Sequence, residues 1–210
     1  MEAAWAMLQT GAEVVIAKGG VHGATVHTRD APPVKVPAYW SPFVFKIGTG
    51  DVFSAAFAHA WAQLGQAPVE AARAASRSVA GYAASRTLPL PPLSASPGGR
   101  PVQARRDGVV HLVGSTARLA DRWLFEEAAW RLGQLGTQVR RWDGAEVTLP
   151  TDDACLMLTD QLTPAEVAAL AATVDPIRLV MLSETGVKSP PGASVTPDFT
   201  TALYWACWSS

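Results

Sequence analysis

Four consecutive residues have the composition of an anion-binding loop. Gly48-Thr49-Gly50-Asp51 follows a β-like run at residues 43–47 and precedes an amphipathic helix. Free backbone N–H groups and the positive end of a helix dipole meet at such a point, and the glycines leave room for a phosphoryl group. A carboxylate at the helix start can accept the proton of an attacking hydroxyl. The same residues also suit a plain tight turn in which Asp51 only stabilises the first helical turn.

Other chemically capable side chains lack the spacing of a site. Cys155 and Cys207 are far apart and belong to no C-x-x-C or Cys/His pattern. This spacing predicts neither a zinc site nor a disulfide framework, and it favours a reducing compartment. The histidines lack ligand spacing too, and we expect them on the surface or in strands. They are His22, His27, His59 and His111.

Charge and hydropathy restrict the class of protein. Lys and Arg number 17 against 18 Asp and Glu, which excludes a general polyanion binder and predicts no nucleic-acid partner. Hydrophobic residues make up 49% of the chain, enough for a packed core. Charged residues interrupt the alanine-rich region before it reaches the roughly 18 apolar residues of a membrane span. The N-terminus has no signal-peptide pattern, so we expect a cytoplasmic protein without membrane contact.

A stretch rich in proline and glycine divides the chain. Residues 87–106 cannot form a helix or a central strand, because proline removes backbone donors. We therefore expect two segments, residues 1–86 and residues 107–210, joined by an extended, semi-rigid spacer.

The first segment mixes strands with two helices. Residues 13–17 and 24–28 read as a strand pair joined by the glycine-rich turn at residues 18–23, and the 43–47 run is β-like. Apolar side chains at i, i+4, i+8 and i+11 then predict one continuous helix after the loop. They are Phe53, Phe57, Trp61 and Leu64. A second helix opens at Pro68 and runs to about Ser85.

The second segment alternates strands and helices, which predicts a small parallel α/β sheet. The predicted strands are residues 108–113, 138–142, 154–159 and 177–182, and a helix is expected at residues 116–135. Thr163, Pro164 and Glu166 have the order of a capping box with proline at the first helical position, so another helix starts there.

Two motifs in the first segment resemble one family. Lys18-Gly19-Gly20-Val21-His22-Gly23, followed by Gly48-Thr49-Gly50-Asp51-Val52-Phe53-Ser54-Ala55-Ala56-Phe57, resembles the C-terminal half of the ribokinase-like, PfkB-type carbohydrate kinases. The resemblance covers residues 1–86. It implies an α/β protein in which a partial ribokinase-like half-domain is joined to a small Rossmann-like domain.

The resemblance also implies roles for individual residues. Gly48, Thr49 and Gly50 would offer backbone donors to the γ-phosphate of ATP, with Mg²⁺ neutralising charge. Asp51 would deprotonate a hydroxyl of a sugar or nucleoside. The remaining residues would line the nucleotide site, with Ser76 near the place of an adenine-side asparagine. They are Lys18, Gly20, Gly23 and Ser76.

Two departures from the family limit this expectation. Phe45-Lys46-Ile47 stands where the family has Asp-Thr, which helps to handle metal and phosphate. The sugar-binding half that precedes these motifs in the family is not found upstream, so catalysis would need that half to be supplied. A non-catalytic module that binds a nucleotide or phosphosugar is the alternative.

The second segment supports a third hypothesis. Residues 110–116 resemble the strand-to-helix entry of Rossmann-like nucleotide-handling domains, including the nucleoside 2-deoxyribosyltransferases. Gly114 and Ser115 could approach a ribose or phosphate there, although an ordinary capped helix has the same pattern. Asp153, Asp160 and Glu184 are candidate acids because each lies near the end of a predicted strand.

Tryptophans are concentrated in the second segment. Trp123, Trp130, Trp205 and Trp208 have helical or near-helical spacing, which is typical of core or interface residues. The apolar tail at residues 204–208 must pack on its own domain or on another chain. A homo-oligomer would satisfy this requirement.

Overall fold

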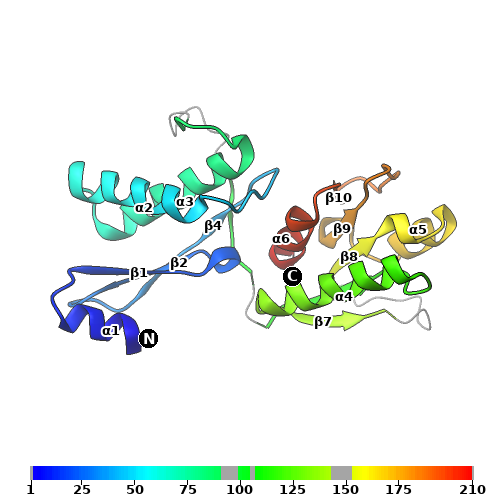
Figure 1. Cartoon of the computed structure of the whole chain (residues 1–210), viewed down its shortest axis with the longest axis horizontal. Coiled ribbons are helices and arrows are strands. Elements are labelled where there is room, and N and C mark those ends of the chain that lie inside the picture. Colours follow the sequence, from blue (N-terminus) through cyan, green and yellow to red (C-terminus); the bar gives the residue numbers. More distant parts are fainter. Residues whose placement is uncertain (1, 91–98, 105–106, 143–152, 210) are drawn as a thin grey trace. The chain divides into compact units, whose positions relative to one another are not determined.

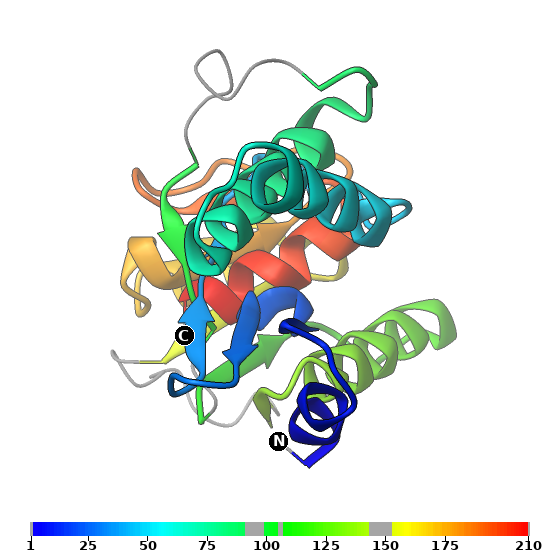
Figure 2. The same cartoon turned by 90° about the vertical axis from the view of Figure 1, so that its left-hand side faces the viewer.

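The computed structural model describes residues 2–90, 99–104, 107–142 and 153–209. The chain divides into two compact units, Met1–Gln103 and Ala104–Ser210 (Figures 1 and 2). The division falls inside the stretch predicted as a linker, but Pro101 and Val102 of that stretch form a short strand of the first unit. The protein is α/β, and within the described ranges no helix has the length and apolarity that crossing a bilayer requires.

The first unit places helices on a small antiparallel sheet. In chain order its elements are α1 (Glu2–Gln9), β1 (Val14–Lys18), a 3-10 turn (Gly20–His22), β2 (Ala24–Thr28), β3 (Val34–Val36), β4 (Ala38–Tyr39), α2 (Thr49–Ala58), a π-helical turn (His59–Gln63), α3 (Pro68–Ser85) and β5 (Pro101–Val102). The strands run in the order β1-β2-β3, and β4 pairs with β5. Helices α2 and α3 lie side by side over the sheet (Figure 1).

The core of this unit lies against one face of strand β2, whose apolar side chains alternate along the strand. Ala24 and Val26 point to the same face of the sheet, because successive strand residues alternate between faces. They pack with Val36 of β3 against Phe53 of α2 and Ala72 of α3. The pattern therefore fixes where the N-terminus of α2 lies, and this is where residues 48–51 are.

Two sequence expectations in this unit are wrong. Residues 43–47 form no strand. Val44 is buried there, and the guanidinium carbon of Arg86 lies 3.8 Å from the centroid of the Phe43 ring. The predicted continuous helix changes to a π-helical turn, in which Leu64 N–H donates to the His59 carbonyl. Because a π turn contains more residues than an α turn, Leu64 rotates off the apolar stripe and is 58% exposed.

The second unit is a doubly wound parallel sheet. Its elements are β6 (Val109–Val113), α4 (Leu119–Gln134), β7 (Gln138–Arg141), β8 (Ala154–Leu158), a 3-10 turn (Thr159–Gln161), α5 (Pro164–Ala171), a 3-10 turn (Pro176–Arg178), β9 (Leu179–Leu182), β10 (Ser194–Thr196) and α6 (Phe199–Ser209). The strand order is β10-β9-β8-β6-β7, and every pair is parallel. The chain leaves β6 towards β7 on one side and returns to β8 on the other, which makes the carboxyl ends of β6 and β8 the switch point.

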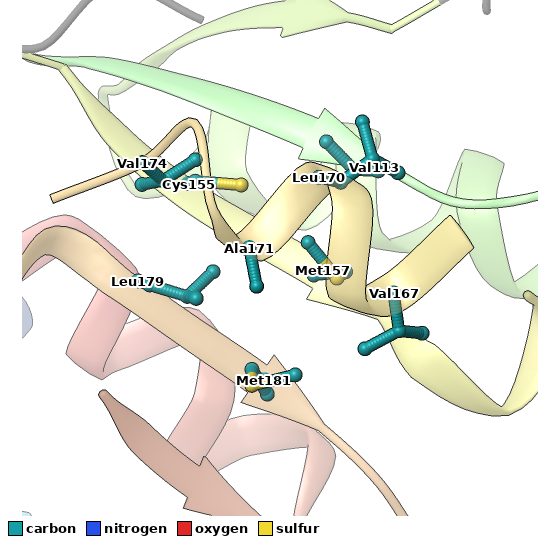
Figure 3. Packing of buried hydrophobic residues seen from close by; sticks show 9 residues of the cluster. All are labelled: Val113, Cys155, Met157, Val167, Leu170, Ala171, Val174, Leu179 and Met181. Atoms are coloured by element: carbon teal, nitrogen blue, oxygen red, sulfur yellow. The ribbon is translucent and has the colours of Figure 1, made fainter. Parts of the chain in front are cut away.

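Helices cover both faces of this sheet. Figure 3 shows Cys155, Met157, Leu179 and Met181 on the face that α5 covers, where Leu170 packs among them. The alternate residues of the same strands point to the opposite face, against which α4 and α6 pack. The three central strands, β6, β8 and β9, are almost wholly apolar because they are buried on both sides.

Local hydrogen bonds from side chains determine where helices α4 and α5 begin. The capping box at Thr163 and Glu166 is present as predicted. Helix α4 starts at Leu119 instead of residue 116, because the Ser115 hydroxyl accepts from the Ala117 N–H and holds the preceding residues in a turn. The short edge strand β10 has no counterpart in the sequence expectations.

Candidate functional site

The predicted anion loop forms the N-terminus of α2. Gly48 adopts φ 77°, in the left-handed region that favours glycine. Its carbonyl accepts from the N–H groups of Asp51 and Val52, while the Thr49 hydroxyl donates to the Lys46 carbonyl at 2.9 Å. Among the described residues, no backbone carbonyl accepts from the Gly50 N–H. That donor can therefore serve a ligand at the positive end of the helix.

The fold brings the second predicted motif to this loop. Lys18 is the last residue of β1, and its Nζ donates to the Gly50 carbonyl at 3.3 Å. A Cβ added to Gly50 would also lie 3.3 Å from that nitrogen, so glycine leaves the ammonium room beside the loop. Lys18 and Gly50 are 32 residues apart in the chain. Two of the sequence-predicted site residues thus lie together.

Asp51 lies in the first turn of α2 and is exposed to solvent. A carboxylate at this place interacts favourably with the helix dipole and is open to an incoming hydroxyl. The hydroxyl of Tyr82 also lies near this loop, 3.1 Å from the position that a Cβ on Gly48 would take. The sequence did not predict a role for Tyr82 at this loop, because the apolar spacing of α3 indicates only that residue 82 faces the core.

The glycines of the 18–23 turn have a packing role. Gly23 adopts φ 78°, and a Cβ there would lie 2.1 Å from the Val36 carbonyl oxygen. Gly20 also has a positive φ, and its carbonyl accepts from the Gly23 N–H. The close backbone approach that Gly23 permits is made to the protein itself. The two glycines shape the end of β1 from which Lys18 reaches the loop.

Ser76 is not part of the loop. It is buried on α3, and its hydroxyl donates to the Pro37 carbonyl at 2.7 Å. This contact ties α3 to the segment between β3 and β4. The hydroxyl therefore already has a partner within the fold, in contrast to the Gly50 N–H.

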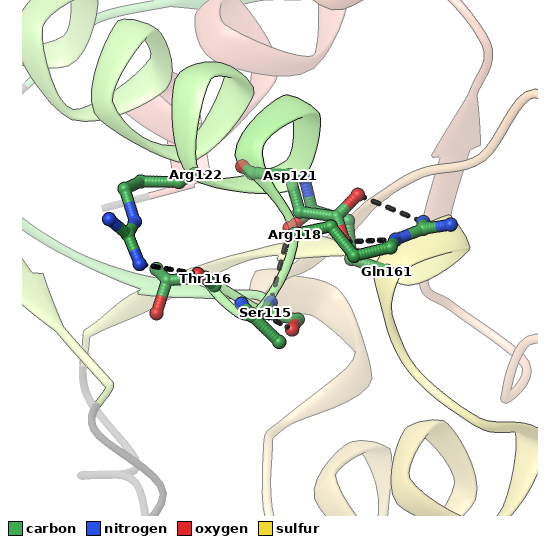
Figure 4. Close-up of polar contacts among 7 residues, drawn as sticks. Ser115, Thr116, Arg118, Asp121, Arg122 and Gln161 are labelled. Atoms are coloured by element: carbon green, nitrogen blue, oxygen red, sulfur yellow. Dashed lines mark hydrogen bonds and ion pairs between the residues drawn. The ribbon is translucent and has the colours of Figure 1, made fainter.

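In the second unit, a glutamine side chain fills the predicted ligand position. Figure 4 shows Gln161 between the end of β6 and the start of α4: its Oε1 accepts from the Ser115 N–H at 3.1 Å, and its Nε2 donates to the Asp121 carbonyl. A Cβ on Gly114 would lie 2.6 Å from that Oε1. The amide of Gln161 thus occupies the place where a ribose or phosphate was expected. No local sequence pattern indicates these contacts, because Gln161 is distant in the chain from both Ser115 and Asp121.

The three candidate acids of this unit do not form one cluster. Asp160 follows β8, and its carboxylate accepts from the Glu184 N–H and the Ser183 hydroxyl. Burial raises the pKa of Asp160, but hydrogen bonds from Thr185, Glu184 and Ser183 outweigh it and hold the pKa below its usual value. Asp153 precedes β8 and contacts His111 Nε2 at 3.0 Å. Asp153 therefore lies at the amino-terminal ends of the parallel strands, whereas Asp160 lies at their carboxyl-terminal ends.

Both cysteines are buried, and their thiols remain protonated at neutral pH. Burial raises the pKa of Cys155 to about 12 and that of Cys207 to about 11. Within the parts of the chain that the structure describes, no group of three or more His, Cys, Asp or Glu side chains could hold a metal ion.

No protein-family model, curated protein or solved structure matches the chain.

Proposed function

We propose that the first unit binds the terminal phosphate of ATP at residues 48–51 and transfers it to a hydroxyl of a sugar or nucleoside. The approach of Lys18 to Gly50 is the observation that carries the proposal. A lysine ammonium beside a helix N-terminus adds to the positive potential there, which the Asp51 carboxylate of the first turn offsets in part and which would attract a phosphoryl group. A phosphoryl group would receive hydrogen bonds from the Gly50 N–H and Lys18 together.

In this proposal each residue has a chemical role. Lys18 and the Gly50 N–H hold phosphoryl oxygens and stabilise the charge that develops during transfer. Asp51 accepts the proton of the acceptor hydroxyl as its oxygen bonds to phosphorus and the bond to ADP breaks. Mg²⁺ bound together with the nucleotide would neutralise charge on the phosphate oxygens.

The test is ADP formation by the chain with Mg²⁺-ATP and a panel of sugars and nucleosides. Asp51→Asn should abolish turnover, whereas ATP binding should persist because Lys18 and the Gly50 N–H are unchanged. Asp30→Asn is the matched control: Asp30 is an exposed aspartate outside the loop, and its substitution should leave turnover unchanged. Turnover that survives Asp51→Asn would reject the catalytic role.

A non-catalytic nucleotide or phosphosugar module is the alternative function. One observation favours it: among the described residues, no hydrogen bond fixes the Asp51 carboxylate, whereas Lys18 is anchored at Gly50. Under this alternative, ATP binds with an affinity that Asp51→Asn does not weaken, and no ADP is formed with any sugar or nucleoside of the panel.

A further inference from the structure

The side chain of Arg86 lies on an aromatic surface in the first unit. Its guanidinium carbon is 3.8 Å from the ring centroid of Phe43 and 5.2 Å from that of Phe45. The shorter distance is typical of a planar guanidinium that lies on the face of a ring. Both rings are half-buried, whereas Arg86 is exposed, so a group from solvent can reach the guanidinium.

The backbone at Arg86 directs this side chain onto the rings. Arg86 directly follows the last residue of α3, and its N–H donates to the Tyr82 carbonyl at 2.8 Å. Among the described residues it is the one non-glycine with a positive φ, 56°, a conformation that is strained for a residue with a Cβ. The ring contacts and the negative end of the α3 dipole favour the cation at this place. The guanidinium is therefore held in position by the fold.

The N–H donors of this guanidinium are not used within the described ranges. No carboxylate or carbonyl there accepts from the Arg86 side chain, whereas Arg131 and Arg141 pair with glutamates. The two phenylalanine rings offer no acceptor in the plane of the guanidinium. Its donors and its charge are thus available to a ligand.

Tyr82 connects the aromatic surface to the loop at residues 48–51. The centroid of its ring is 6.1 Å from that of Phe45, and its hydroxyl oxygen lies 3.1 Å from the position of a Cβ on Gly48. A ligand held at the loop therefore has this surface beside it. We call it the aromatic platform, and its side chains are Phe43, Phe45, Tyr82 and Arg86.

We propose that the nucleobase of a nucleoside triphosphate stacks on the Arg86 guanidinium while its phosphates lie at residues 48–51. The inference rests on the proposed phosphate site and adds the end of the ligand that the loop does not bind. A nucleobase is planar, stacks on guanidinium planes and carries acceptors at its edge for the unused N–H groups. Half-buried phenylalanine rings would desolvate a phosphate without offering it a donor, so they favour the base.

The test is calorimetric titration of the full chain with Mg²⁺-ATP and, separately, with magnesium tripolyphosphate, which has no base. Arg86→Lys keeps the charge but removes the planar group. It should weaken ATP binding by about tenfold and leave tripolyphosphate binding unchanged. Arg77→Lys is the matched control, because Arg77 is also exposed on α3 and its guanidinium lies 5.5 Å from the Tyr39 ring. This second variant should bind both compounds as the wild type does.

The two probes separate failure of the platform from failure of the phosphate site. Unchanged tripolyphosphate binding shows that the Arg86→Lys protein is folded at the loop. Wild-type affinity for ATP in that variant would overturn the stacking of the base and leave the phosphate site intact. Equal weakening of ATP and tripolyphosphate binding would also overturn it. A wild-type chain that binds neither compound would overturn the phosphate site and this inference together.

Discussion

The ammonium nitrogen of Lys18 lies 3.3 Å from the carbonyl oxygen of Gly50. The core of the first unit produces this contact, because apolar residues of β2 and β3 hold α2 over the sheet whose strand β1 ends at Lys18. The lysine therefore adds positive charge to a helix N-terminus that is already positive. The Asp51 carboxylate in the first turn of α2 offsets this charge in part, and the remaining positive potential would attract an anionic ligand.

Gly23→Ala should disrupt the first unit. The new Cβ would lie 2.1 Å from the Val36 carbonyl oxygen, and the residue would also keep a positive φ. We expect a loss of about 4 kcal/mol or more in unfolding free energy, measured by calorimetry. Gly19→Ala is the matched control, because its nearest contact, the Gly23 oxygen, lies at 3.3 Å. Equal stability of the two variants would contradict the packing role of Gly23.

Two glycines near the end of α4 should respond in opposite ways to alanine. Gly133 lies inside the helix with no atom within 4 Å of an added Cβ, so Gly133→Ala should stabilise the second unit by about 0.5–1 kcal/mol. Gly136 has φ 82°, and Gly136→Ala should destabilise it by about 1 kcal/mol. Urea unfolding measures both differences. Changes of the same sign in the unfolding free energy would contradict the helical position of Gly133 or the left-handed conformation of Gly136.

Stability should depend on pH through Asp160. Its pKa is lower in the folded chain than in the unfolded chain, so its contribution is present above the unfolded pKa of about 4 and is lost as pH falls below that value. Asp160→Asn should reduce stability at pH 7 by about 1 kcal/mol, since the residue is largely exposed, and the difference should shrink at pH 3. Urea unfolding of both proteins at the two pH values measures it. A stability difference between the two proteins that is the same at pH 7 and pH 3 would contradict a lowered pKa of Asp160 in the folded chain.

Neither thiol should react in the folded protein. Burial raises the pKa of Cys155 to about 12 and that of Cys207 to about 11, so almost no thiolate forms at pH 8. Iodoacetamide followed by mass spectrometry should find both cysteines unmodified in the native chain and both alkylated in denaturant. Rapid labelling of either one at pH 8 without denaturant would contradict its burial.

Local patterns predicted the regular elements well. Alternation along β2 and the buried run of β8 identified strands, and the capping box at Thr163 identified the start of α5. These features depend on neighbours in the chain, so they can be read from the sequence. The α/β class follows from their order.

Contacts between distant residues could not be predicted. The side chain of Gln161 takes the position expected for a ligand of Gly114 and Ser115, and nothing near Gln161 in the chain indicates it. Trp123 and Trp130 have the spacing of core or interface residues, but only packing decides that they point outward. At residues 48–51 the local pattern predicted the start of helix α2, whereas the approach of Lys18 to Gly50 depends on how β1 and α2 pack.

Titration of Mg²⁺-ATP into the chain by isothermal calorimetry tests the central claim most directly. Lys18→Gln should weaken ATP binding by about tenfold, because it removes the charge beside the Gly50 N–H, a loss of about 1.4 kcal/mol. Lys35→Gln removes an equal charge from an exposed position on β3 and should bind ATP as the wild type does. No measurable binding of ATP to the wild-type chain, or equal weakening by both substitutions, would contradict an anion site at Lys18 and residues 48–51.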